Sequence, residues 1–259
     1  MVESLILKNK SAQGQLNEKG YVIVSLLQAE DVLNLTNFYN QNNAELPSGL
    51  SATAHNPDFA FRAKMSDFIH ETVRVKINEK FNNIKMLGGT FMSKTKGESG
   101  VLPPHQDWTL VDEKEHASYN LWIPLVDVNQ NNGSIQVIDG SHKWKEGVRG
   151  PNLHGPFAES TDEMWGKMNT LDMKAGEVLV YDHRLVHSST ENNTDQNRLV
   201  VVFGIIPESA EMRIYYLEKN KEVAYHCSSD FFMKNNPHEG PIGLKPIKKA
   251  SFWKRVMKF

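Results

Sequence analysis

Short apolar runs separated by polar turns dominate the chain from about residue 84 onward. The runs are rich in β-branched and aromatic residues, and Gly, Pro and Asn punctuate the segments between them. This pattern predicts strands over residues 85–93, 119–125, 134–138, 177–181, 199–206 and 212–216. Several short strands with turn signals between them favour a β-sandwich or barrel over alternating βαβ units.

The region before residue 84 has more helix-like patterns. After Gly20, residues 21–24 form a short β-branched run that predicts one strand, and residues 29–40 have the apolar spacing of an amphipathic helix. Ser66 is expected to cap a second helix, in which apolar residues recur at every fourth position: Ile69, Val73, Ile77 and Phe81. Because both helices precede the β-rich region, we expect them to support one face of its sheet.

Neither an internal repeat nor a low-complexity linker divides the 259 residues, so we expect a single domain. It would consist of a helical buttress at about 1–83, a β core at about 84–216 and a C-terminal extension at 217–259. The basic and apolar tail, residues 245–259, is expected to dock on the domain as a C-terminal helix, with contact to a membrane surface as the alternative.

Composition and charge narrow the classes of function. A formal net charge of -2 gives no general attraction for nucleic acid or an anionic membrane, and no stretch approaches the ~20 apolar residues that span a bilayer. We expect no signal peptide, because the N-terminus has no long apolar core and no small-residue cleavage site. The single cysteine, Cys227, cannot form an internal disulfide, which fits a reducing cytoplasm.

Candidate chemistry starts with a pair of metal-binding residue types, His105 and Asp107, one residue apart. In an extended chain such residues lie on the same side and can reach one cation. A chain with ten histidines can contain this triplet by chance, so a second element is needed. Farther along, the predicted strand after Gly176 leads to His187, which a jelly roll can bring beside His105. Two histidines and one carboxylate form the facial triad of oxygen-activating Fe(II) sites, in which open positions remain for co-substrate and O₂.

A candidate carboxylate anchor follows the second histidine. Arg198 comes eleven residues after His187 and begins the apolar run 199–203. The planar guanidinium of an inward-pointing arginine can bind a carboxylate through two parallel hydrogen bonds. Alone, Arg198 reads as a surface residue that flanks a strand. Together with a metal site it suits 2-oxoglutarate, which chelates iron at one end and needs its other carboxylate neutralised.

These motifs resemble the phytanoyl-CoA hydroxylase-like family of 2-oxoglutarate oxygenases. The resemblance includes His105-x-Asp107, the intervals to His187 and Arg198, the opening at 18–24, and the segments 121–125, 131–134 and 139–143. It covers roughly residues 18–206. It implies a mainly β fold with flanking helices, a double-stranded β-helix of the jelly-roll, cupin-like type, with one mononuclear iron.

The resemblance also implies roles for individual residues. His105, Asp107 and His187 match the metal ligands, and Arg198 matches the 2-oxoglutarate anchor. Three further residues are expected around the co-substrate: the hydroxyl of Ser189, the inward-facing Trp122, and Asn120, which shares the strand parity of Trp122. The implied reaction is hydroxylation of an unactivated C–H bond in a small or medium-sized metabolite, with 2-oxoglutarate and O₂ consumed and succinate and CO₂ released.

Substrate contacts are expected at two places. Trp108 follows Asp107 and would line the substrate cavity, with a packing role as the alternative. Residues 140–176 form the longest stretch of the β region without a predicted strand, and long irregular segments in compact domains are often lids. Arg149 in this segment would bind an anionic group of the substrate, whereas the alternative is a solvated surface loop.

Two other functions compete with a hydroxylase. A halogenating relative would need a small residue in place of the carboxylate ligand, and Asp107 argues against it. A non-catalytic cupin-like protein that binds a metal or metabolite would have no use for the carboxylate clamp of Arg198 and Ser189. The sequence therefore favours a cytoplasmic dioxygenase, with its primary substrate and oligomeric state open.

Overall fold

A six-stranded antiparallel sheet forms the larger layer of the molecule. The computed structural model describes residues 5–42, 48–144, 147–153 and 161–247. The order of strands in the sheet is β1-β8-β5-β10-β3-β2. Their bounds are β1 Tyr21–Ser25, β2 Leu50–Ala52, β3 Ile84–Lys94, β5 Tyr119–Pro124, β8 Glu177–Asp182 and β10 Arg198–Pro207.

A four-stranded antiparallel sheet forms the second layer, in the order β4-β9-β6-β7. These strands are short: β4 Leu102–His105, β6 Ile135–Val137, β7 Asn169–Thr170 and β9 His187–Ser189. Side chains from both sheets share one buried cluster, with Trp122 and Val200 from the larger sheet against Ile135 and Val137 from the smaller. The two facing sheets make the double-stranded β-helix, or jelly roll, that the sequence predicts.

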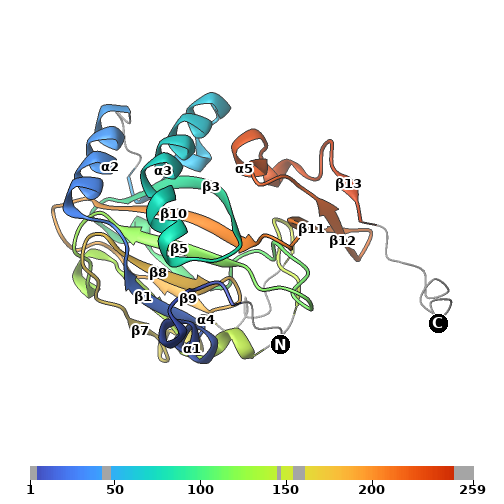
Figure 1. Ribbon diagram of the computed structural model, residues 1–259, viewed down its shortest axis with the longest axis horizontal. Coiled ribbons are helices and arrows are strands. Elements are labelled where there is room, and N and C mark those ends of the chain that lie inside the picture. The colour runs from blue at the N-terminus through green and yellow to red at the C-terminus, as the bar shows by residue number, and fades with distance from the viewer. Residues whose placement is uncertain (1–4, 43–47, 145–146, 154–160, 248–259) are drawn as a thin grey trace.

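Three helices lie against the larger sheet: α1 Lys10–Lys19, α2 Ala29–Asn42 and α3 Phe59–Lys80. Figure 1 shows α2 and α3 on one face of this sheet. The apolar stripe of α3 packs with Phe91 and Val201 of the sheet in the largest buried cluster. The predicted start of this helix at Ser66 is wrong. Asp58 caps α3 by accepting hydrogen bonds from the backbone N–H groups of Ala60 and Phe61, and Ser66 lies inside the helix.

The C-terminal region folds back onto the end of the jelly roll. It contains a small antiparallel sheet of β11 Arg213–Glu218, β12 Lys221–His226 and β13 Lys245–Pro246, together with helix α5 Phe231–Lys234. Helix α5 contacts both α3 and β3, and the N–H of Gly88 donates to Ser229 O. The expected C-terminal helix falls mostly on residues 248–259, which lie outside the described residues.

Short helices connect the longer elements: η1 Thr53–His55, η2 Glu98–Gly100, η3 Gln130–Asn132, η4 Ser141–Lys143, α4 Thr161–Trp165 and η5 Pro237–Glu239. All the strands predicted from the apolar runs are present, with ends shifted by two residues or fewer. No helix in the described part of the chain is long and apolar enough to cross a membrane.

Helix α3 gives a direct test of how the jelly roll is supported. Ile69 is fully buried between this helix and β3, so Ile69→Ala removes apolar contacts and leaves a cavity. We expect the free energy of unfolding to fall by about 2–5 kcal/mol. Val75 of the same helix is 65% exposed, and Val75→Ala should change the free energy of unfolding by no more than about 0.5 kcal/mol. Urea unfolding of both variants measures the difference, and equal effects would show that α3 does not support the sheet.

Candidate metal centre

Strand pairing in the smaller sheet brings two histidines together. β4 pairs with β9 in antiparallel register, and His105 at the end of β4 lies opposite His187 at the start of β9. Their ring centroids are 4.2 Å apart. Asp107 comes two residues after β4, where its backbone N–H donates to His183 O at 2.9 Å. This bond fixes the turn that carries the carboxylate toward both imidazoles.

The three side chains offer their ligand atoms to one point. Asp107 Oδ1 lies 3.9 Å from His105 Nε2, and Asp107 Oδ2 lies 3.7 Å from His187 Nε2. One ligand atom from each residue lies within 4.8 Å of the others, close enough for a single metal ion. The predicted triad is therefore assembled in space, although the segments that carry it are about eighty residues apart.

Hydrogen bonds orient these side chains for metal binding. Nδ1 of His105 lies 2.7 Å from Pro103 O, and Nδ1 of His187 lies 3.0 Å from Leu185 O. Since a carbonyl can only accept, each Nδ1 carries the proton and each Nε2 is left with its lone pair directed at the shared point. The amide of Asn120 donates to Asp107 Oδ2 at 2.7 Å and orients the carboxylate. The donor set fits a divalent metal such as Fe(II).

The protonation states of His105 and Asp107 also favour binding of a metal cation. Burial, followed by the charge of the neighbouring His187, lowers the pKa of His105 to about 4, so its imidazole is neutral at neutral pH. Burial opposes ionisation of Asp107, but the nearby histidines and the bond from Asn120 outweigh it and bring its pKa down to about 2. A neutral imidazole and an ionised carboxylate are the forms that bind metal.

A buried guanidinium lies beside this centre. Arg198 is the first residue of β10 and is 2% exposed. Its NH1 donates to Gly133 O at 2.8 Å, its Cζ lies 5.4 Å from the Trp122 ring centroid, and its Nε has no hydrogen-bond partner among the described residues. Burial lowers its pKa to about 10, which leaves it charged. Such a charge is costly unless an anion pairs with it.

A second buried cation, Lys94, was not predicted from the sequence. It ends β3, directly opposite Arg198 in the register of β3 and β10. Its Nζ donates to Ser189 Oγ at 2.7 Å and to Thr190 O. Burial, followed by the charge of Arg198, lowers the pKa of Lys94 to about 7. No carboxylate of the described residues forms an ion pair with either cation, so the pair is suited to an anion.

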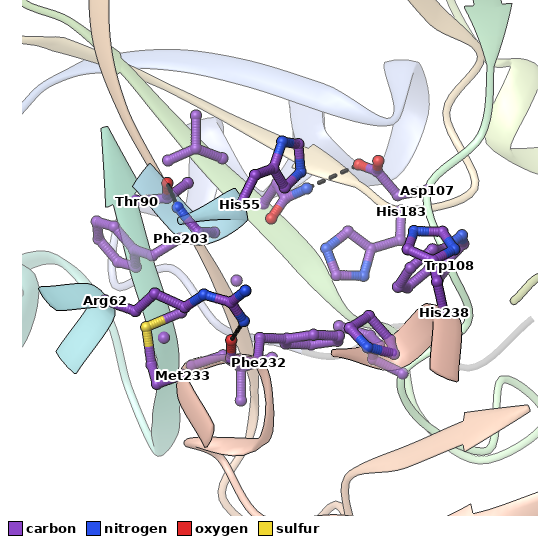
Figure 2. A pocket seen from close by; sticks show the side chains of 18 of the residues that line it. His55, Arg62, Thr90, Asp107, Trp108, His183, Phe203, Phe232, Met233 and His238 are labelled. Carbon is purple, nitrogen blue, oxygen red and sulfur yellow. Dashed lines mark hydrogen bonds between the residues drawn. The ribbon is translucent and has the colours of Figure 1, made fainter. Parts of the chain in front are cut away.

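A cavity of about 780 Å³ is lined by His105 and Asp107 of the triad, whereas His187, Arg198 and Ser189 are not among its lining residues. Figure 2 shows Asp107, Trp108 and His183 on one side of it, with Phe232 and His238 of the C-terminal region close by. The structure therefore puts Trp108 on the cavity wall, as expected for a substrate contact. The contribution of the C-terminal region was not predicted, because no metal-binding or anchoring pattern marks it.

Arg149, the expected substrate anchor, does not line the cavity. It is buried, its NH1 and NH2 bind both carboxylate oxygens of Glu113, and its Nε donates to Asp107 O at 2.6 Å. The interpretation of Arg149 as a free anion-binding group is wrong because Glu113 already neutralises it. It supports the backbone of the His105–Asp107 turn instead. The described part of the expected lid, 140–176, gives no cavity-lining residue, and 145–146 and 154–160 lie outside the described residues.

Comparisons with known proteins agree with this geometry. The family model described as phytanoyl-CoA dioxygenase matches residues 17–200. A phytanoyl-CoA dioxygenase of Arabidopsis thaliana is 31% identical over 116 residues, which are 42% of this chain and 39% of that protein. Dioxygenase sphC of Aspergillus fumigatus is 27% identical over 165 residues, 59% of this chain and 41% of that protein. The matches thus span less than half the length of these relatives.

Solved structures with the same fold include SnoN and HygX. The epimerase SnoN from nogalamycin biosynthesis superposes with a TM-score of 0.58 at 19% identity, covering 93% of this chain and 95% of SnoN. HygX from Streptomyces hygroscopicus, solved with nickel, 2-oxoglutarate and hygromycin B, gives 0.56 at 17% identity, covering 78% and 88%. At this identity the likeness establishes the fold.

The triad predicts a defined loss of metal binding. His187→Ala leaves two of the three converging side chains. We expect Fe(II) affinity to fall by at least about tenfold, since loss of a residue that only hydrogen-bonds to a metal ligand already has an effect of this size. His226→Ala, an exposed histidine of β12, is the matched control and should bind Fe(II) as the wild type does. Anaerobic equilibrium dialysis measures both. Wild-type affinity in His187→Ala would exclude this residue as a ligand.

Proposed function

The chain belongs to the phytanoyl-CoA dioxygenase family, and on that premise we propose that it is an Fe(II)- and 2-oxoglutarate-dependent oxygenase. It hydroxylates an unactivated C–H bond of a small or medium-sized metabolite and releases succinate and CO₂. The observation that carries this proposal is the triad of His105, Asp107 and His187 together with two buried cations, Arg198 and Lys94, that form no ion pair with a carboxylate of the described residues. A metal site and a carboxylate anchor are what 2-oxoglutarate requires.

The residues divide into two groups by task. His105, Asp107 and His187 would hold iron, and three protein ligands leave coordination positions for co-substrate and O₂. When bound, iron and 2-oxoglutarate supply the oxidising chemistry, in which O₂ oxidatively decarboxylates 2-oxoglutarate and one oxygen atom enters the substrate C–H bond. Asn120 keeps the Asp107 carboxylate oriented throughout, through its 2.7 Å hydrogen bond.

The distal carboxylate of 2-oxoglutarate would bind between Arg198 and Ser189. The Trp122 ring limits the movement of the guanidinium, and Gly133 O holds its NH1, so the remaining N–H groups are pre-oriented. Lys94 acts through Ser189: by donating to Ser189 Oγ it leaves the hydroxyl hydrogen free to bond the carboxylate. It also adds a second positive charge to the anchor.

Proteins with the same fold support 2-oxoglutarate as the co-substrate, but they do not all carry out the same type of oxidation. HygX was solved with 2-oxoglutarate, and SnoN is described as a non-heme, α-ketoglutarate-dependent epimerase. We favour hydroxylation here because the similar proteins of Arabidopsis thaliana and Aspergillus fumigatus are both dioxygenases. We assign the enzyme to the cytoplasm, since its single cysteine suits a reducing compartment.

Turnover without substrate tests the proposed function. Purified protein with Fe(II), O₂ and 2-oxoglutarate should form succinate slowly, because the co-substrate can react at an assembled site before substrate binds. Asp107→Ala should abolish succinate formation, while Asp195→Ala, which removes an exposed surface carboxylate, should leave it unchanged. Chromatographic quantification of succinate measures the reaction. No succinate from the wild type, with or without a metabolite library, would favour the non-catalytic cupin-like alternative.

The depressed pKa of Lys94 predicts how co-substrate binding depends on pH. A bound carboxylate favours the protonated amine, so binding draws a proton onto Lys94 once the pH exceeds its free-state pKa of about 7. The dissociation constant of 2-oxoglutarate should therefore be lowest below pH 7 and rise by up to about tenfold per pH unit above it. His105 titrates at about 4 and contributes nothing in this range.

Calorimetric titration of the Ni(II)-loaded protein with 2-oxoglutarate measures this dependence. Lys94→Met should bind more weakly below pH 7 and lose the pH dependence above it. Lys96→Met, which removes an exposed lysine two residues away, should keep the wild-type profile. A flat wild-type profile, or an unchanged slope in Lys94→Met, would mean that Lys94 does not bear on co-substrate binding.

A further inference from the structure

The lining of the cavity contains basic and apolar side chains but a single acid. Among the described lining residues the only carboxylate is Asp107, which belongs to the metal triad. On the side formed by η1, α3 and η5, the cavity is lined by His55, Arg62 and His238. A cationic substrate would therefore lose its hydration without gaining a carboxylate, whereas an anionic substrate would meet three nitrogen donors.

Arg62 is built into this wall rather than projecting from it. It is 7% exposed, and its Nε donates to Asn56 O while its NH1 donates to Phe232 O and Asn235 O. These carbonyls satisfy part of the guanidinium but carry no full charge. NH2 makes no hydrogen bond within the described residues. Burial lowers the pKa of Arg62 and the charge of Glu239 opposes this, but neither Glu239 nor another described carboxylate forms an ion pair with Arg62. The group is thus a rigid, buried cation with donor capacity to spare.

Two histidines extend this basic wall. His55 lies close enough to Arg62 and His238 that their charges, after the larger effect of burial, lower its pKa. The His238 ring packs edge-on against Trp108, with 5.5 Å between ring centroids. A bound anion would offset the mutual repulsion of these groups and raise the pKa of His55, because opposite charges favour the charged form.

Apolar side chains form a large part of the remaining lining, next to polar residues such as Thr90, Gln106 and Asn236. Trp108, Phe203, Phe232 and Met233 lie around the cavity (Figure 2). Gly88 lets the Met233 side chain pack closely against β3, since a Cβ there would lie 2.9 Å from the terminal methyl carbon of Met233. A volume of about 780 Å³ is in the range of pockets for drug-sized ligands.

We propose that the primary substrate is a carboxylic acid with an apolar body, whose carboxylate is bound by Arg62, His55 and His238. The apolar part lies among the aromatic side chains and presents a C–H bond to the triad. This inference rests on the proposed function, because it assumes that the cavity beside the triad receives the oxidised substrate.

A matched set of ligands tests the inference. Decanoate, decanamide and decylamine share one carbon chain, and phenylbutyrate, its amide and the corresponding amine share another. Each is titrated into the Ni(II)- and 2-oxoglutarate-loaded protein while tryptophan fluorescence is followed, since Trp108 lines the cavity. At least one acid should bind at least about tenfold more tightly than its amide, as expected for a charged hydrogen bond, and the amines should bind least.

Substitutions test whether the preference for an acid over its amide comes from His55, Arg62 and His238. Arg62→Gln should remove most of the acid-over-amide preference, whereas Arg74→Gln, an exposed arginine on the same helix, should retain it. Because Arg62 also holds the C-terminal region through Phe232 O and Asn235 O, His238→Gln is the second variant and should lower the preference with the fold intact.

Several results would overturn the inference. They are an amine or amide that binds as tightly as its acid, no binding by any acid, or a full acid preference in both Arg62→Gln and His238→Gln. If the wild type still binds 2-oxoglutarate and forms succinate in these cases, only the substrate class is wrong. If the wild type does neither, the proposed function fails, and this inference fails with it.

Discussion

The antiparallel pairing of β4 with β9 sets the distance between His105 and His187, and the site depends on it. β9 has only three residues, yet it carries a triad histidine at one end and Ser189 of the carboxylate anchor at the other. It is held on its second side by β6, where Val137 lies opposite His187. In the larger sheet, the pairing of β3 with β10 brings Lys94 opposite Arg198. Two strand registers therefore determine the spacing of metal ligands and anchor.

The second feature that connects the fold with the function is a set of buried cations that form no ion pair with a described carboxylate. Elsewhere in the molecule buried cations are paired, as Arg149 is with Glu113 and Arg184 with Asp182. Arg198, Lys94 and Arg62 are buried with no ion pair to a described carboxylate. Each costs stability in the free protein, and a bound anion would recover part of that cost. The co-substrate accounts for the first two, and a carboxylic acid substrate would account for the third.

Local sequence signals predicted the long strands and the residues of the triad, because apolar runs and the intervals between His105, Asp107, His187 and Arg198 are visible in the chain. The short strands β4 and β9 were not predicted, since they are defined by pairing with partners distant in sequence. The same limit applies to Lys94, whose burial depends on its register opposite Arg198, and to Arg149, whose partner Glu113 is 36 residues away. The local sequence does not distinguish the start of α3, because Asp58 and Ser66 are both acceptable caps and only the structure shows that Asp58 is the one used. The roles of the site residues remain predictions.

In this account the metal triad and the buried cations Arg198 and Lys94 together bind one dicarboxylate, 2-oxoglutarate. The most direct measurement is an anaerobic titration of the Fe(II)-loaded protein, followed by the visible charge-transfer absorbance of a 2-oxoacid chelated to iron. 2-Oxoglutarate should produce this absorbance at a concentration at least about tenfold lower than 2-oxobutyrate, which has the same chelating end but no distal carboxylate. Equal half-saturation concentrations for the two acids would contradict the account, because the cations at Arg198 and Lys94 would then have no part in binding.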